Sequence, residues 1–308
     1  RGSKIEKRVD DVNRLMRDGI LNEKDNIAFG EGGAGTFSDG KLTTGTKNPR
    51  IRYVLDTFLA HGAPAEIGYD ALPHIGTDRL RAVIINMRKE LERLGTTFMF
   101  DTKFVDFYDQ DDKHITVVEN AEGKQEIVCD ALVLALGHSA RDTYRMLDQK
   151  LEIVPKSFAV GVRIEQLQST INKLQYKQDA NSPYLQAAPY KLAVKTSEGR
   201  GVYTFCMCPG GVVVPSTEKD GYLCVNGMSY YARNKANANS AILVQVNPED
   251  FPEGSLGGIT FQEDIEKKAY QLGGNNLKAP VQKVVDYYQH KKSEELGKVI
   301  PSYMPGTV

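Results

Sequence analysis

The chain has 308 residues, of which 41% are hydrophobic and 26% are charged, and its net charge at pH 7 is −1. This is the composition of a folded globular protein, and the length suits two domains or one large interrupted domain. The small net charge creates no electrostatic field that would attract nucleic acid or an anionic membrane. No run approaches the roughly 20 apolar residues of a membrane span, and the first residues lack the apolar core of a signal peptide. We therefore expect a cytoplasmic protein without a nucleic-acid or membrane partner.

The N-terminal part predicts a surface helix and then a glycine-rich loop. Apolar residues recur at helical spacing over residues 4–18, and Gly19 is expected to end this helix. Residues 28–42 read AFGEGGAGTFSDGKL and include the G-x-G-x-x-G spacing of a dinucleotide-binding fingerprint. Only residues 27–29 could form a strand before it, and no helical pattern follows, so we expect an irregular loop over 30–45 whose bare backbone lies close to another group. A flexible surface loop is the alternative.

Two helices and a set of short strands are expected next. The helices are predicted over residues 51–61 and from Gly76-Thr77-Asp78 to Gly95. Short strands are predicted at 97–100, 103–108, 115–119 and 126–129, of which those within 103–129 form a β-meander.

The run ALVLAL at residues 131–136 is continuously apolar, which predicts a strand buried on both faces of a parallel sheet. It is followed by Gly137-His138-Ser139 and an expected helix over 140–149. This arrangement sets backbone amides at the carboxyl edge of a sheet, where α/β proteins bind their ligands.

The second half predicts a mixed or antiparallel sheet with peripheral helices. Strands are expected at 157–165, 191–195, 201–205, 211–215, 221–226 and 241–246, and helices at 166–174, 261–272 and 279–291. A boundary near residues 151–157 divides the chain into predicted domains 1–152 and 153–308.

Several motifs in their order along the chain resemble a known family. They are FGEGGAGTFSDGKL (29–42), PHIGTDRL (73–80), LVLALGHSARDTYRML (132–147), FAVGVRIE (158–165), YTFCMCPGGVVV (203–214) and VNGMSYYARNKANANSAILVQV (225–246). Together they are similar to bacterial and plastid FAD-dependent proteins described as NAD(FAD)-utilizing dehydrogenases. The resemblance runs along nearly the whole chain.

This resemblance implies the fold class and the place of the chain within it. The expected fold is α/β (α+β mixed), with an incomplete, glutathione-reductase-like FAD/NAD(P)-binding domain over 1–152 interrupted by a mixed or antiparallel β-sheet substrate domain over 153–308. The chain looks like the middle portion of such a protein, without the N-terminal G-x-G-x-x-G segment and without the C-terminal segment that closes over FAD. Arg1-Gly2 match the end of the family's Glu-Arg-Gly motif, although Arg-Gly-Ser is also a common tag remnant.

The resemblance also implies which residues contact FAD. The glycine loop would approach the pyrophosphate or ribityl region, the start of the meander would touch the adenine, and the second glycine motif would lie near the cofactor. The implied contact residues are Gly32, Gly33, Ser38, Asp39, Gly40, Val105, Gly137, His138 and Ser139.

A flavin performs its own hydride chemistry, so few catalytic side chains are expected. Cys206 and Cys208 could face the flavin ring, or they could be small hydrophobes at alternate positions of a strand, where a disulfide between them would need distortion. No zinc site is expected from this CxC pair. His138 is a candidate acid or base because it follows the predicted sheet strand, with backbone hydrogen bonding as the alternative.

Two polar residues of the second half are substrate-binding candidates. Arg163 lies in an otherwise apolar strand and could bind an anionic substrate, or it could pair with Glu165 on one strand face. Asn226 belongs with Asn237 and Asn239 to a region that reads as a polar loop. His74 is expected to be exposed to solvent.

The sequence thus predicts part of an FAD-dependent oxidoreductase of undefined small-molecule substrate, with NADH or NADPH as a possible electron donor and an undetermined oligomeric state. A truncated domain that binds no flavin by itself, or a flavoprotein that senses or scaffolds, are the alternatives.

Overall fold

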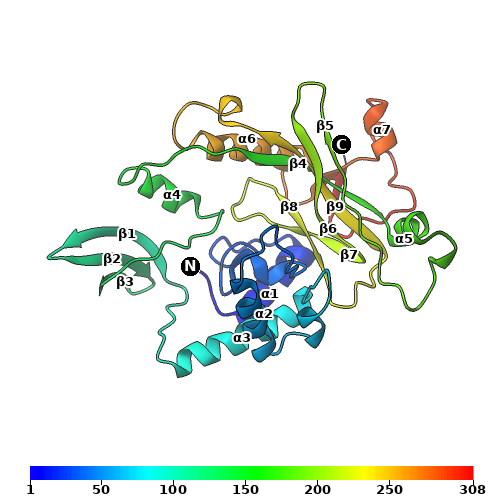
Figure 1. Cartoon of the computed structure of the whole chain (residues 1–308). Helices are drawn as coiled ribbons and strands as arrows, with labels where there is room; N and C mark the ends of the chain where they lie inside the picture. The colour runs from blue at the N-terminus through cyan, green and yellow to red at the C-terminus, as the bar shows by residue number, and fades with distance from the viewer. Residues whose placement is uncertain (308) are drawn as a thin grey trace.

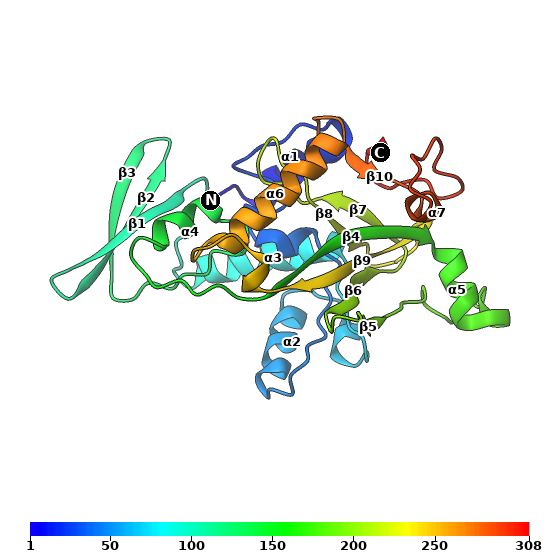
Figure 2. The same ribbon diagram turned by 90° about the horizontal axis from the view of Figure 1, so that it is seen from above.

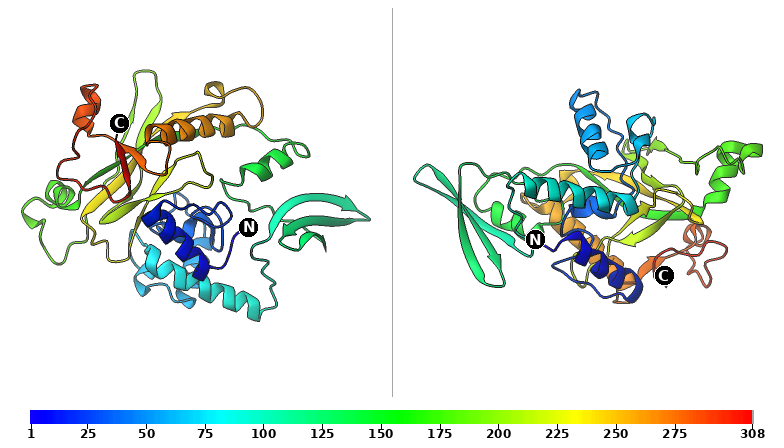
Figure 3. Two further views of the ribbon diagram at one scale, coloured as in Figure 1. Left: turned by 180° about the vertical axis from the view of Figure 1, so that it is seen from behind. Right: turned by 90° about the horizontal axis from the view of Figure 1, so that it is seen from below.

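The computed structural model describes residues 1–307 and has a mixed α/β fold, as expected. In Figures 1 and 3 the meander of residues 103–129 projects at one end of the molecule, and helices α5 (Gln168–Tyr176) and α7 (Val284–Tyr288) lie at the opposite end. The N-terminal helices and the glycine loop lie between these ends, against the hairpin of strands β7 (Gly211–Pro215) and β8 (Val225–Ser229) (Figure 1).

The helices follow the predicted periodicity closely. Helix α1 ends at Gly19, which takes the left-handed conformation (φ 67°) that favours glycine at this position. The α-helices in the described chain are α1 (Ile5–Asp18), α2 (Arg50–Ala60), α3 (Thr77–Arg93), α4 (Arg141–Leu147), α5 (Gln168–Tyr176), α6 (Gly257–Leu272) and α7 (Val284–Tyr288), with 3-10 helices η1 (Gly33–Phe37), η2 (Ala65–Gly68), η3 (Lys177–Asp179) and η4 (Pro248–Asp250).

The strands form separate sheets that are mainly antiparallel. They are β1 (Lys103–Gln110), β2 (Lys113–Asn120), β3 (Gly123–Cys129), β4 (Phe158–Leu167), β5 (Ala193–Lys195), β6 (Gly201–Cys208), β7 (Gly211–Pro215), β8 (Val225–Ser229), β9 (Asn237–Val246), β10 (Ala279–Val281) and β11 (Pro305–Thr307). The main sheet has the order β4-β9-β6-β5, beside the sheet β1-β2-β3, the hairpin β7-β8 and the parallel pair β10-β11.

The longest pairing joins β4 and β9, which run antiparallel from Phe158↔Val246 to Leu167↔Asn237. Helix α6 lies beside this sheet (Figure 1, Figure 2). There Phe251 and Phe261 pack on Phe158, with ring centroids 4.9 and 6.2 Å from the Phe158 ring. Aromatic contacts therefore attach the peripheral helix to the sheet.

The prediction of a buried sheet strand at residues 131–136 is wrong. The segment has no regular secondary structure, and the side chain of Val133 is 85% exposed. A strand needs neighbours that accept its backbone hydrogen bonds and cover its faces, and no strand of residues 1–307 pairs with this segment.

Other predicted elements differ in extent. Residues 97–100 form no strand, and the strand expected at 221–226 lies at Val225–Ser229. The helix expected over 279–291 is reduced to α7, because residues 279–281 pair with β11. The meander, by contrast, is confirmed, with antiparallel register from β1 through β3.

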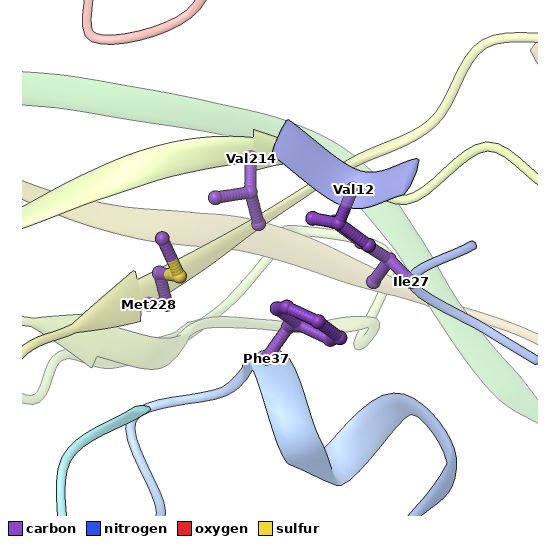
Figure 4. Packing of buried hydrophobic residues seen from close by; sticks show 5 residues of the cluster. All are labelled: Val12, Ile27, Phe37, Val214 and Met228. Carbon is purple, nitrogen blue, oxygen red and sulfur yellow. The ribbon is translucent and has the colours of Figure 1, made fainter. Parts of the chain in front are cut away.

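A buried apolar cluster joins the N-terminal elements to the hairpin. It is formed by Val12 of α1, Ile27 just before the glycine loop, Phe37 within the loop, and Val214 and Met228 of β7 and β8 (Figure 4). The first part of the glycine loop is thus anchored in the core, which excludes a loop that is free throughout its length, whereas residues 43–45 are exposed. No helix in residues 1–307 is both long and apolar enough to cross a membrane.

Candidate functional site

The glycine loop is held by a buried arginine. Arg8 is 0% exposed, and its guanidinium donates to the carbonyl oxygens of Asn26 (2.8 Å), Ile27 (2.6 Å) and Glu31 (2.5 Å). The side chain of Glu31 in turn accepts from Nε of Arg88 at 2.7 Å. Burial lowers the pKa of Arg8 to about 10, so Arg8 remains charged at neutral pH. These donors therefore hold the backbone at the start of the glycine loop.

The glycines of this loop serve different purposes. A Cβ on Gly30 would lie 2.5 Å from Cδ of Arg8, and a Cβ on Gly32 would lie 2.2 Å from Oγ1 of Thr36. These two glycines are therefore required by packing inside the protein. Gly33 also has a positive φ (61°), but no atom lies within 4 Å of its Cβ position. At Gly33, unlike at Gly30 and Gly32, the turn leaves room for another molecule.

Gly33 lines a pocket of about 290 Å³ at which three distant segments meet. The glycine loop, the start of β1 and the irregular segment before α4 each contribute residues. The pocket is lined by Arg1, Ala28, Phe29, Gly30, Gly33, Lys103, Phe104, Ala135, Leu136, Ala140 and Thr143.

Two positively charged side chains at this pocket pair with the same carboxylate. Arg1 Nη2 lies 2.5 Å from Asp142 Oδ1, and Lys103 Nζ lies 2.5 Å from Oδ2 of the same residue. Burial of Asp142 opposes its ionisation, but hydrogen bonds from these two cations lower its pKa to about 2. The guanidinium of Arg1 also covers the Phe29 ring, 4.4 Å from its centroid. The pocket therefore combines two cations with aromatic and aliphatic faces.

The predicted FAD contacts are only partly brought together. Gly33 lines the pocket, and the residues directly before Val105 and before Gly137 line it as well. Gly137 has a positive φ (71°) and, like Gly33, open space at its Cβ position. Val105 itself falls at an irregularity of the β1–β2 register.

The other predicted contacts have partners of their own. The hydroxyl of Ser38 donates to the carbonyl oxygen of Gly35 at 2.8 Å, and the carbonyl oxygen of Gly40 accepts from the amide of Ile75. His138 is exposed, with Nε2 3.0 Å from the side-chain amide of Gln262, and the Ser139 carbonyl oxygen accepts from the amide of Arg141.

A second group of chemically active side chains gathers at the end of β6. Lys41 Nζ lies 3.8 Å from Sγ of Cys206 and 3.9 Å from Sγ of Cys208. The same ammonium group donates to the carbonyl oxygen of Met207. Lys41 stands in the glycine-loop motif, yet nothing in the sequence signalled that it would reach two cysteines 165 and 167 residues away.

Arg163 joins this group instead of pairing with Glu165. It donates to Oδ1 of Asn239 at 2.6 Å and to the carbonyl oxygen of Cys206 at 2.7 Å, and Nη2 lies 3.5 Å from Sγ of Cys208. Glu165 accepts from Asn237. The alternative of an Arg163–Glu165 pair is therefore wrong, because residues of the neighbouring strands pair with each of them instead. We name Lys41, Arg163, Cys206 and Cys208 the thiol cluster.

Asp39 belongs beside the thiol cluster. Its side chain is 1% exposed, and Oδ2 accepts from Arg233 at 2.7 Å and lies 3.4 Å from Lys41 Nζ. Its other oxygen, Oδ1, has no hydrogen-bond partner among the described residues.

Two expectations about polar residues are corrected. His74 is buried, with Nε2 3.1 Å from the carbonyl oxygen of Tyr231, and burial and the charge of Arg233 lower its pKa. Asn226 lies on β8, and Asn237 and Asn239 lie on β9, so the region that read as a polar loop consists largely of paired strands. The side chain of Asn226 accepts from the next amide of its own chain, that of Gly227.

A third charged group, which we name the carboxylate cluster, joins α4 to α6. Arg141 makes a bidentate pair with Glu266 (2.9 and 2.6 Å), and its Nε lies 3.2 Å from Oε1 of Glu218. Glu263 lies 3.9 Å from Arg141 and 2.6 Å from Arg145. Burial raises the pKa of Glu218 to about 7, and the charges of the other two carboxylates add to this against the attraction of Arg141. No group of three or more metal-ligating side chains occurs within the described residues.

The chain is similar in sequence to known proteins. An uncharacterized protein of Clostridium beijerinckii is 49% identical over 309 residues, which cover 99% of this chain and 57% of that relative. The chain thus spans little more than half the length of this relative. A solved structure described as the crystal structure of FqzB matches over 62% of this chain and 36% of its own length at 9% identity, with a TM-score of 0.26, too low to support an argument. Residues 157–308, the second half of the chain, match the model of the family described as FAD-dependent protein, C-terminal domain-like.

Proposed function

We infer that the chain is part of an FAD-dependent oxidoreductase and that the pocket lined by Gly33 holds part of the flavin nucleotide. The observation that carries this proposal is the convergence of three segments on one pocket. Two of them, at Lys103 and Phe104 and at Ala135 and Leu136, directly precede residues expected to contact FAD. The family match over residues 157–308 supports the same cofactor independently of the pocket.

The lining of the pocket fits a portion of a dinucleotide. Small-molecule sites commonly measure about 300–1,000 Å³, so about 290 Å³ accommodates a portion of FAD. Arg1 and Lys103 suit a phosphate, while Phe29, Phe104 and Leu136 suit the face of a ring. The open space at Gly33 is what a close approach to the backbone requires.

When bound, the flavin would supply the hydride or electron transfer, and the protein would supply binding, orientation and exclusion of water. The substrate is proposed to be a small molecule, and NADH or NADPH is the proposed electron donor. Turnover of either nucleotide by the flavin-loaded protein would separate an oxidoreductase from a flavoprotein that only senses or scaffolds.

The direct test is equilibrium dialysis of the chain against FAD, using Ala135→Trp to fill the pocket. Ala135 is exposed and lines the pocket, so a large side chain there obstructs the ligand with little effect on packing. Ala131→Trp is the matched control, since Ala131 is equally exposed in the same segment and does not line the pocket.

We expect wild type and Ala131→Trp to bind FAD and Ala135→Trp to lose at least tenfold in affinity. The chain has no native tryptophan, so the indole of Ala131→Trp also reports binding by energy transfer to the flavin. Failure of wild type to bind FAD, or equal binding by both variants, would overturn the assignment of the cofactor to this pocket.

A further inference from the structure

The backbone that carries the thiol cluster departs from regular strand geometry. The register between β6 and β9 shifts between Phe205 and Cys208, so that Cys206 and Met207 have no paired partner on β9. Cys206 has φ 47° and is the one residue other than glycine with a positive φ inside a strand of the described chain. Such conformations persist where surrounding contacts hold them, and they are concentrated at functional sites.

The contacts that hold this conformation come from three directions. Arg163 donates to the Cys206 carbonyl oxygen at 2.7 Å, Sγ of Cys208 lies 3.2 Å from the same oxygen, and Lys41 donates to the Met207 carbonyl oxygen. Two cations are thereby fixed beside two sulfur atoms. A pair of cysteines that only filled space would need neither cation.

The two thiols differ in exposure and in acidity. Cys206 is half-buried and Cys208 is 0% exposed. Hydrogen bonding to Cys208 lowers the pKa of Cys206 to about 5, against the effect of burial and with the help of Lys41 and Arg163. The same hydrogen bond, followed by burial, raises the pKa of Cys208 well above its usual value. The half-buried sulfur of Cys206 is therefore the more acidic of the two, and the buried sulfur of Cys208 is the less acidic.

We propose that Cys206 and Cys208 form a dithiol–disulfide redox pair, in which Cys206 attacks a disulfide substrate and Cys208 resolves the resulting mixed disulfide. This activity uses residues of the chain alone and does not depend on the proposed flavin site.

The first step forms one sulfur–sulfur bond and breaks another. The Cys206 thiolate attacks one sulfur of a substrate disulfide, and the substrate's second sulfur leaves as a thiolate that takes a proton from water. Lys41, 3.8 Å from Sγ of Cys206, helps the Cys208 hydrogen bond to lower the pKa of the attacking sulfur.

The second step becomes possible because the first step removes two of the causes that raise the pKa of Cys208. Once Cys206 is in a mixed disulfide, its negative charge and its hydrogen bond no longer raise the pKa of Cys208, while Lys41 and Arg163 still lower it. Cys208 then loses its proton to solvent, attacks Cys206, and releases the second substrate thiolate. The balance is one dithiol and one disulfide giving the Cys206–Cys208 disulfide and two substrate thiols.

Two buried polar atoms near the thiol cluster lack hydrogen-bond partners in the described part of the chain, as is common at functional sites. Asp39 Oδ1 and Asn239 Nδ2 belong to residues that are 1% and 0% exposed, and neither atom has a hydrogen-bond partner among residues 1–307. Buried polar atoms rarely lack a hydrogen-bond partner, and a functional role is one explanation for the exceptions. The distortion that a disulfide between i and i+2 residues would require on a regular strand is already present at Cys206.

The test uses oxidised glutathione and intact-protein mass spectrometry on the full chain carrying Cys129→Ser and Cys224→Ser, so that only the pair can react. We expect the pair to lose the mass of two hydrogen atoms with release of two glutathione molecules. With Cys208→Ser added, one glutathionyl group should stay attached at Cys206. With Cys206→Ser added, reaction should be at least tenfold slower.

Circular dichroism checks that each variant is folded, and Cys208→Ala serves as a second resolving variant if Cys208→Ser is not. A stable glutathione adduct on the protein that retains both cysteines would contradict the proposal, because Cys208 would then not resolve it. Equal reaction rates in the Cys206→Ser variant and its parent would contradict the role of Cys206.

Discussion

The thiol cluster and the carboxylate cluster are both compact groups of charged side chains, but their charges are balanced in opposite directions. In the thiol cluster, Lys41 and Arg163 stand beside two ionisable sulfurs. In the carboxylate cluster, three glutamates share Arg141, with Arg145 reaching only Glu263.

The two clusters also shift the pKa of their central groups in opposite directions. The hydrogen bond from Cys208, helped by the charges of Lys41 and Arg163, lowers the pKa of Cys206 to about 5. Burial, helped by the charges of Glu266 and Glu263 and opposed by Arg141, raises the pKa of Glu218 to about 7. One fold thus lowers the pKa of a thiol and raises that of a carboxyl group, because a hydrogen bond favours the charged form of one group and burial disfavours the charged form of the other.

The largest effect is expected from removing the cation of the carboxylate cluster. Arg141→Met leaves Glu218 and Glu266 buried without their shared partner, and breaking a buried ion pair commonly costs about 3–5 kcal/mol. Urea denaturation at pH 8 measures the loss, which should shrink at pH 5 as carboxylates become protonated. Arg93→Met, which removes only an exposed pair with Glu90, should leave the urea midpoint nearly unchanged.

Glu218→Gln tests the same cluster in the opposite direction. Because the folded-state pKa of Glu218 (about 7) lies above its ordinary value of 4.5, the protonated form is favoured by folding. This contribution is fully present below pH 4.5 and is lost as the pH rises through 7.

The variant should therefore match wild type near pH 4.5 and be more stable at pH 8 by up to about 3 kcal/mol, at 1.36 kcal/mol per pKa unit. Glu152→Gln, at an exposed position, is the matched control. A variant that loses stability equally at both pH values would show that Glu218 acts through its hydrogen bonds and not through its charge.

A smaller change is expected in the thiol cluster. The rate of iodoacetamide alkylation of Cys206 in the background without Cys129 and Cys224 should have its pH midpoint near 5 in the protein that retains the pair. Lys41→Met removes one nearby charge and should raise the midpoint by about one pH unit or more. Cys208→Ala removes the largest cause of the low pKa and should raise the midpoint further. Lys89→Met, on the exposed side of α3, should leave it unchanged. The reverse order of the two effects would mean that the lysine dominates.

Patterns that depend on local spacing predicted structure well. The apolar period and the terminal glycine located α1 and α3, and turn residues located the meander, since both kinds of element satisfy their hydrogen bonds within a short stretch of chain. The prediction of a strand from the apolar run at 131–136 was wrong for the opposite reason, because a buried strand depends on partners that are distant in the sequence.

The candidate sites show the same limit. The glycine motif pointed to close backbone approach, but only the packing of Arg8 and Thr36 distinguishes Gly30 and Gly32 from Gly33. Cys206 and Cys208 were candidates from their spacing, whereas the positive φ of Cys206 and the reach of Lys41 arise from long-range contacts that leave no pattern in the sequence.

The exposed segment 131–136 has a practical consequence. An irregular, solvent-exposed run of alanine, leucine and valine is a preferred place for proteolytic cleavage, and elastase, which cleaves after small apolar residues, should cut here early. Because Ala135 and Leu136 also line the pocket, a bound molecule would shield the segment from the protease. The rate of digestion then measures occupancy of the pocket for any ligand, whether or not it is coloured.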